Sequence, residues 1–200
     1  MAYDYRKMSL EEREELVRVR KANGYPLHSP PHLIREQGYY LITAACYEHA
    51  AIMSLSKRRS EFESRILSSL QTSDIQISAW VILPNHYHIL IGVTDFEKIP
   101  VFIKKLHNGT SYEWNREDNC SGKRKVWFHY LDRFIRDEPQ YFQAINYIHF
   151  NPVKHAYVED PFHWHWSSLN LYYENNGRDW LRQTWINFPP QKLNIGELDG

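Results

Sequence analysis

The spacing of apolar residues switches along the chain between the period of a strand and that of a helix. Aromatic and β-branched residues crowd four short stretches, and longer stretches between them carry apolar residues at helical spacing. Strands are predicted at residues 39–44, 75–83, 87–93 and 126–131, and helices at residues 56–71 and 99–114. The order strand, helix, strand, strand, helix, strand predicts the βαββαβ antiparallel sheet of a ferredoxin-like α+β fold.

A further helix is predicted outside this repeat, at residues 138–151. Pro139 is acceptable in its first turn, and Pro152 is expected to close it. Its apolar stripe should face the sheet and consists of Phe142, Ile145 and Ile148. Gln143, Tyr147 and Asn151 recur every fourth residue and should share another side of the same helix.

The rest of the chain is expected to lie outside the core domain, which we place at residues 38–173. Residues 1–37 are interpreted as an N-terminal extension. It contains a helix at residues 10–21, where Ser9 and Glu12 have the spacing of a capping box, followed by a proline-rich connector. Residues 174–200 are polar and are expected to form a C-terminal tail.

Composition narrows the class of protein. A hydrophobic fraction of 42% over 200 residues is ample for a packed core. The two cysteines form no CxxC pair, and neither a signal peptide nor a membrane span is evident, so a cytoplasmic protein is expected. Lys and Arg total 24, as do Asp and Glu, so any binding of nucleic acid would need a local basic face.

The first chemical signal is the pair His86 and His88, at the start of the third predicted strand. Alternate residues of a strand face the same side, so both imidazoles can converge on one divalent ion. The spacing alone is weak evidence, because His163 and His165 repeat it among aromatic residues, where packing is the better explanation. Polar contacts near the end of a strand remain the alternative for the first pair.

The second signal is Tyr147 with Asn151, one helical turn apart. A carboxamide oxygen can serve as a hard metal ligand, and a phenol one turn earlier can reach the same centre. The alternative is a half-buried tyrosine beside a helix-ending Asn-Pro.

Several of these segments resemble one family. Residues 80–88 read WVILPNHYH and resemble the HUH motif of single-tyrosine transposases, in which U is a bulky hydrophobic residue. Residues 147–155 read YIHFNPVKH and resemble the tyrosine helix of the REP-associated tyrosine transposases. Residues 132–138 (DRFIRDE) and 164–168 (WHWSS) are similar to the same branch. The resemblance implies the ferredoxin-like sheet with an added C-terminal helix that bears the tyrosine.

The resemblance also implies roles for individual residues. His86 and His88 match the metal ligands, Asn151 matches a third ligand, and Tyr147 matches the nucleophile. The implied metal is Mg²⁺ or Mn²⁺. The implied reaction is cleavage and rejoining of single-stranded DNA near hairpins, through a 5′-phosphotyrosine intermediate. Basic residues expected to contact DNA, each of which could also be a solvated surface charge, are Lys104, Lys105, Arg124, Arg133, Arg136 and Lys154.

Two points stay open beside the resemblance. The family often carries Gly-Leu-Val after the Asn-Pro-Val-Lys stretch, whereas this chain has Ala156, Tyr157 and Val158, which puts the geometry of that turn in question. Relatives differ in acting as monomers or as homodimers that exchange the tyrosine helix, and the sequence does not choose.

Other functions remain open as well. One is a domesticated protein that binds hairpins without cutting them. Another is a ferredoxin-like RNA-binding protein with an incidental pair of histidines, which would expose aromatic residues on its sheet. Trp80 and Trp127 are expected in the core rather than stacked on bases.

Overall fold

The computed structural model describes residues 36–69, 74–120 and 124–190, together with residues 9, 11, 12, 14, 15, 18 and 19. Most of the predicted N-terminal helix and connector lie outside these described residues. Ser9 and Glu12 do exchange the two hydrogen bonds of a capping box, since each backbone N–H donates to the other's side chain, at 2.7 and 3.2 Å.

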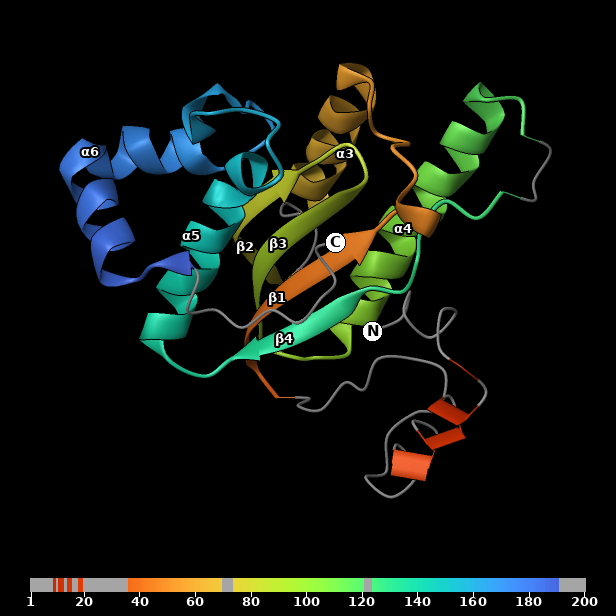
Figure 1. The fold of residues 1–200 in the computed structure, drawn as a ribbon, viewed down its shortest axis with the longest axis horizontal. Coiled ribbons are helices and arrows are strands. Elements are labelled where there is room, and N and C mark those ends of the chain that lie inside the picture. The colour runs from red at the N-terminus through yellow and green to blue at the C-terminus, as the bar shows by residue number, and fades with distance from the viewer. Residues whose placement is uncertain are drawn as a thin grey trace.

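A four-stranded antiparallel sheet forms the centre of the molecule (Figure 1). Its strands are β1 (Gly38–Ala45), β2 (Ile75–Ile82), β3 (His86–Val93) and β4 (Leu131–Ile135). They lie in the order β2-β3-β1-β4, so each βαβ unit holds a strand of the other unit between its own two strands. The predicted α+β class is confirmed. The short Pro-Asn turn makes β2 and β3 a hairpin, as expected from their closeness in sequence.

Helices α3 (Ser56–Ser69) and α4 (Lys98–Glu117) cover one face of the sheet (Figure 1). Both form where apolar residues recur at helical spacing, and that spacing becomes the buried stripe of each helix. Phe62 and Ile66 of α3 and Ile99, Phe102, Ile103, Leu106 and Trp114 of α4 are buried. Tyr87 and Trp127 complete this core from the sheet side.

Helix α5 (Glu138–Lys154) covers the opposite face of the sheet (Figure 1). Asp137 caps its start by accepting a hydrogen bond from the Gln140 N–H at 2.8 Å. Ile145 and Ile148 are buried against the sheet, as predicted. Phe142, the third member of the predicted stripe, also packs against this core but is only partly buried, and its ring stacks on Phe188 with centroids 5.0 Å apart.

The predicted end of this helix before Pro152 is wrong, since the helix continues to Lys154. A proline lacks the N–H that would bond to the carbonyl four residues earlier. The N–H groups of His155 and Tyr157 still donate to the carbonyls of Asn151 and Pro152, at 3.1 and 2.9 Å. One missing hydrogen bond in the last turn is therefore tolerated.

The expected C-terminal tail also begins later than predicted, because helix α6 (Leu169–Asn187) crosses the expected boundary at residue 173. Gly177 lies at φ 80° and ψ 171°, so the helix is interrupted there. Leu181 and Thr184 are buried after the interruption, and the carbonyl of Thr184 accepts a hydrogen bond from the Asn146 side chain at 3.1 Å. The polar composition of residues 174–200 gave no indication of these few buried contacts.

The fourth predicted strand, at residues 126–131, is wrong, because β4 begins where that strand was expected to end. Trp127 makes an isolated bridge with Cys46. Its indole fills the core and donates to Thr110 Oγ1 at 2.9 Å. The apolar run at residues 126–131 therefore reflects the burial of the Trp127 side chain in the core. The strand itself is the edge segment that follows, in which only Ile135 is fully buried.

The other edge of the sheet, along β2, is covered by the chain between α5 and α6. The N–H of Ile82 donates to the Trp166 carbonyl at 2.9 Å, and the N–H of Ser168 donates to the Trp80 carbonyl at 3.0 Å. Trp164 also donates from Nε1 to the Ile82 carbonyl at 3.0 Å. This pairing brings the segment after the tyrosine helix alongside the β2–β3 hairpin. None of the helices among the described residues is both long and apolar enough to cross a membrane.

Candidate active site

Strand β3 places His86 and His88 on the sheet face that α5 covers. Their imidazole centroids are 5.1 Å apart, as the alternation of a strand predicts. Tyr87, between them, points to the opposite face, where its hydroxyl forms a hydrogen bond with His107 Nε2 at 2.8 Å. Both histidines are buried, with exposed fractions of 3% and 0%.

Helix α5 brings Tyr147 and Asn151 to the same place. Asn151 Oδ1 lies 3.3 Å from His86 Nε2, and the ring of Tyr147 lies 5.1 Å from the ring of His88. Tyr147 and Asn151 are one helical turn apart, and His86 and His88 are two residues apart on a strand. Tyr147 therefore faces His88, and Asn151 faces His86.

With the Asn85 and Asn151 amides in this orientation, His86 faces two acceptor oxygens, and a neutral ring cannot donate to both. Its Nδ1 lies 2.7 Å from Asn85 Oδ1, and its Nε2 lies 3.3 Å from Asn151 Oδ1. Burial, more than the neighbouring His155, lowers the pKa of His86 to about 3, so the ring is neutral near pH 7 and carries one N–H. The shorter contact fits the N–H, which leaves the Nε2 lone pair facing an amide oxygen. A cation between those two acceptors would stabilise the arrangement.

His88 is held in a similar way. Its Nδ1 forms a hydrogen bond with Thr43 Oγ1 on β1, at 2.8 Å. Burial and then the neighbouring His86 keep the pKa of His88 well below its usual value, so this ring is also neutral near pH 7. Neutral imidazole is the form that binds metal ions, and a hydrogen bond to the other ring nitrogen commonly fixes its orientation.

Tyr147 is 6% exposed, and its hydroxyl is buried. Neither this hydroxyl nor Asn151 Nδ2 has a hydrogen-bond partner among the described residues. Lys154 Nζ lies 5.3 Å from the centroid of the Tyr147 ring. A buried polar group without a partner costs free energy, so these atoms favour a ligand at this position.

Three further residues were missed by the sequence reasoning. His155, the C-cap of α5, has its ring 4.9 Å from the ring of His86. It lies one turn beyond Asn151, so the spacing of Tyr147 and Asn151 could have found it had the helix been predicted to continue. Thr43 has no local signal, because only the pairing of β1 with β3 brings it opposite His88. Asn85 was seen as part of a turn and not as a partner of His86.

No three His, Cys, Asp or Glu side chains within the described ranges come close enough together to hold a metal ion. The site instead combines two imidazoles with a carboxamide. That donor set suits a divalent ion whose remaining ligands are oxygens.

The predicted basic residues divide into two groups. Arg133 pairs in register with Leu41, which belongs to the core under α5, so its side chain lies on the face of the histidines. Burial and then the charge of Arg136 lower the pKa of Arg133, which places these two arginines near each other. Lys154 lies above Tyr147, as described. Arg136 lies just before α5 and Lys154 is its last residue, so the length of the helix separates them, and only Arg133 and Lys154 are placed on the face of the site.

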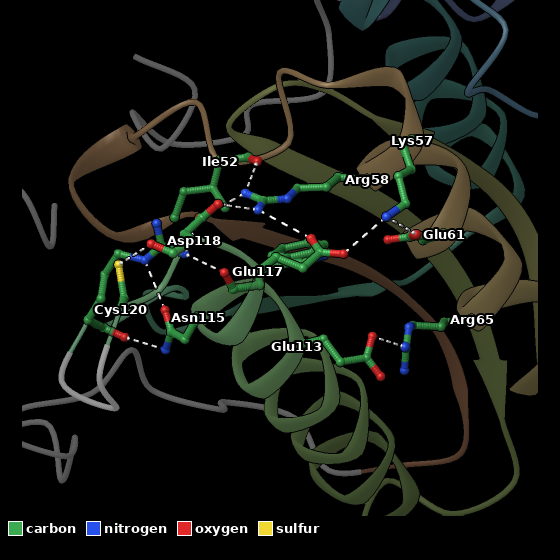
Figure 2. Close-up of polar contacts among 12 residues, drawn as sticks. Ile52, Lys57, Arg58, Glu61, Arg65, Glu113, Asn115, Glu117, Asp118 and Cys120 are labelled. Atoms are coloured by element: carbon green, nitrogen blue, oxygen red, sulfur yellow. Dashed lines mark hydrogen bonds and ion pairs between the residues drawn. The ribbon is translucent and has the colours of Figure 1, made fainter.

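The other three basic residues lie elsewhere. Lys104 and Lys105 are exposed on α4, which covers the opposite face of the sheet. Arg124 forms an ion pair with Asp118 at 2.7 Å and donates from Nε to Asn115 at 2.9 Å. It belongs to the polar network between α3 and α4, in which Asp118 also binds Arg58 (Figure 2).

The second histidine pair is not built like the first. His163 ends a short 3-10 helix (Pro161–His163), and His165 follows beyond Trp164. Both histidines are exposed, whereas Trp164 is buried and packs edge-on against Trp166 at 5.4 Å. Aromatic packing explains this segment, and Trp80 and Trp127 are likewise buried, as expected.

Comparison with known proteins gives a consistent result. No protein-family model matches the chain. The REP-associated tyrosine transposase of Escherichia coli K12 is 29% identical over 100 residues, which cover 48% of this chain and 54% of that protein. A Haemophilus influenzae relative with the same family name is 26% identical over 120 residues, which cover 56% of this chain and 68% of that protein.

A solved structure shares the fold. It is a REP-associated tyrosine transposase bound to a REP hairpin, and it matches with a TM-score of 0.56 at 22% identity, over 72% of this chain and 84% of that one. The match to the E. coli protein spans about half of that protein's length (54%). Sequence likeness and fold together confirm the resemblance seen in the motifs: the chain is related to the REP-associated tyrosine transposases.

Proposed function

We propose that this chain cuts and rejoins single-stranded DNA beside hairpins, with Tyr147 as the covalent nucleophile. The observation that carries the proposal is the convergence of β3 and α5, which sets Tyr147 against His88 and Asn151 against His86. A structural tyrosine would not require two neutral imidazoles and an unpaired carboxamide beside it. The shared fold with a hairpin-bound transposase supports the substrate class.

We propose that His86, His88 and Asn151 hold a divalent ion, Mg²⁺ or Mn²⁺. His86 would bind through Nε2 and Asn151 through Oδ1, since these two acceptors already face each other. For His88 we propose Nε2, because Nδ1 is engaged with Thr43. The bound ion would offset the negative charge that develops on the phosphate oxygens.

The chain's own contribution is the nucleophile and its surroundings. The Tyr147 oxygen would attack the phosphorus of the scissile phosphodiester, and the bond to the 3′ oxygen would break. The phenol gives up its proton and the departing oxygen takes one up, so the products are a free 3′ hydroxyl and a 5′-phosphotyrosine. Attack by a 3′ hydroxyl on that linkage reverses the step without ATP, because the phosphodiester energy is retained.

The proposed partner is single-stranded DNA with a hairpin. Arg133 lies on the sheet face of the histidines and Lys154 lies beside Tyr147, so both would contact backbone phosphates near the site, whereas Arg136, at the other end of α5, would contact DNA farther away. The overall charge is balanced, so these local charges are what the proposal needs. We place the activity in the cytoplasm, where the two free cysteines would stay reduced.

A cleavage assay tests the proposal. Labelled hairpin DNA from the flanks of the gene would be incubated with wild-type protein and with Tyr147→Phe, in Mn²⁺ or in EDTA. We expect a covalent protein–DNA adduct with the wild type in Mn²⁺ only. Tyr173→Phe is the matched control, since Tyr173 is 45% exposed on α6 and should leave the adduct unchanged. Tight binding without any adduct would instead assign the chain to the non-cutting hairpin binders.

A further inference from the structure

A second group of side chains lies beside the candidate site, at the β2 edge of the sheet. Arg59 of α3 contacts two tryptophans of the segment that covers this edge. Its guanidinium carbon is 3.9 Å from the ring centroid of Trp166 and 5.3 Å from that of Trp164. Tyr157 lies against Trp164, with centroids 5.4 Å apart. We call Arg59, Tyr157, Trp164 and Trp166 the edge cluster.

The charge of Arg59 is not matched by a carboxylate. Its side chain donates from Nη1 to the carbonyls of Met53 and Ser54, at 2.7 and 2.8 Å, and the residue is only 7% exposed. None of the ion pairs among the described residues involves Arg59, and its Nε has no hydrogen-bond partner there. The neighbouring Arg58, by contrast, binds both Glu117 and Asp118 (Figure 2). A buried cation without a counter-charge attracts an anion to the surface above it.

Tyr157 provides an accessible ring beside this charge. It is 40% exposed, although Trp164 covers part of it. The Arg59 charge opposes the rise in the pKa of Tyr157 that burial causes, so hydroxyl and guanidinium lie near each other. An exposed aromatic ring next to a positive charge is the combination that single-stranded nucleic acid binds, by base stacking and phosphate neutralisation.

The edge cluster is continuous with the candidate site. The ring of Tyr157 lies 6.2 Å from the ring of His155, which in turn lies 4.9 Å from the ring of His86. A DNA strand with its scissile phosphate at His86 would therefore pass Tyr157 with its neighbouring nucleotides. No such continuity exists for the exposed Tyr112 on α4, because α4 covers the other face of the sheet.

We propose that Tyr157 stacks on a base of the single-stranded segment that flanks the scissile phosphate, and that Arg59 offsets the charge of the adjoining backbone. This inference rests on the proposed function and specifies one contact of its substrate. It assigns the edge cluster to the flanking strand and not to the hairpin stem.

Binding measurements on two DNAs test this inference. Fluorescence anisotropy would give the Kd of the wild type and of Tyr157→Ala for a hairpin with a single-stranded extension and for the same hairpin without it. One stacked base is worth enough that we expect Tyr157→Ala to weaken binding of the extended DNA about tenfold, with little change for the bare hairpin. Tyr157→Phe should bind as the wild type does, and so should Tyr112→Ala.

The fluorescence of 2-aminopurine separates stacking from loss of structure. In the extension, 2-aminopurine should lose fluorescence on binding to the wild type and to Tyr157→Phe, but not to Tyr157→Leu, which keeps an apolar side chain without the ring. Equal Kd values for Tyr157→Ala and wild type on the extended DNA would overturn the inference and leave the proposed function intact. Equal weakening on both DNAs would also overturn it. Failure of the wild type to bind either DNA would overturn the proposed function together with the inference.

Discussion

Asn151 Oδ1 lies 3.3 Å from His86 Nε2, and this contact joins helix α5 to strand β3 at the centre of the candidate site. Because the other nitrogen of His86 is held by Asn85 at 2.7 Å, two acceptors face each other across the gap. A site of this kind should gain stability from a bound cation.

Mn²⁺ should therefore raise the melting temperature of the wild type, and Asn151→Ala should reduce that rise. A ligand at 100 times its Kd adds about 2.7 kcal/mol to the free energy of unfolding, so the shift is large enough to measure. Thermal unfolding over a series of Mn²⁺ concentrations, with EDTA as the reference, is the measurement. His163→Ala is the control, because His163 is exposed and outside the site. An equal rise in Asn151→Ala and wild type would exclude Asn151 as a ligand.

Ala156→Gly should stabilise the protein. Ala156 has φ 56°, in the left-handed region that a Cβ disfavours, just after helix α5. Relief of this strain, less the entropy that glycine loses on folding, should add about 0.5–1 kcal/mol to the free energy of unfolding. Urea unfolding would measure it. Ala144→Gly, in the middle of α5, should have the opposite sign, and a loss of stability in Ala156→Gly would contradict the strain.

The stability supplied by His107 should decrease as the solution becomes more acidic. Burial lowers the pKa of His107 to about 3, whereas the unfolded chain has a value near 6.5. The neutral ring stacks on Trp127 with centroids 4.5 Å apart. Between these two pKa values the unfolded state binds a proton that the folded state does not, so stability is present above pH 6.5 and is lost as the pH falls.

The loss due to one histidine has a slope of at most about 1.4 kcal/mol per pH unit. Other buried histidines share the trend, so the test is a difference. The free energy of unfolding of wild type minus His107→Gln should be larger at pH 7 than at pH 5. A difference independent of pH would show that His107 titrates normally in the folded protein.

The two thiols should differ in reactivity. Burial raises the pKa of Cys46 to about 12, and its side chain is fully covered, whereas Cys120 is partly exposed. The thiolate is the reactive form, so a thiol reagent at neutral pH should label Cys120 in the folded protein and both residues in denaturant. Mass spectrometry of labelled peptides would measure this. Rapid labelling of Cys46 without denaturant would contradict its burial in the core.

Patterns in the sequence correctly predicted those features of the site that depend on residues close together in the chain. The alternation of β3 was enough to place His86 and His88 together, and the helical repeat was enough to place Tyr147 beside Asn151. Thr43 was out of reach, because its role depends on the register between β1 and β3. The fourth strand was predicted wrongly around Trp127, because a single buried aromatic residue and a buried strand give similar apolar runs in the sequence.

Charged residues were harder to place than apolar ones. Arg124, in a basic loop, and Arg133, in a family segment, were both expected to contact DNA, yet Arg124 belongs to an ion network with Asp118 and Arg133 lies on the face of the site. The ion network of Arg124 depends on the packing of α3 against α4, which brings Arg58 to Asp118 (Figure 2). Helix α6 was missed because its second half carries few buried apolar residues.

The covered hydroxyl of Tyr147 has a consequence for how such a chain would discriminate among DNA molecules. If Tyr147 is the nucleophile, a phosphate reaches its oxygen only after α5 or its neighbours shift, and binding free energy must supply that rearrangement. A DNA with few contacts would bind and dissociate with its backbone intact. Selectivity would then appear in the rate of adduct formation more than in the Kd, which protects unrelated single strands from being nicked during replication or repair.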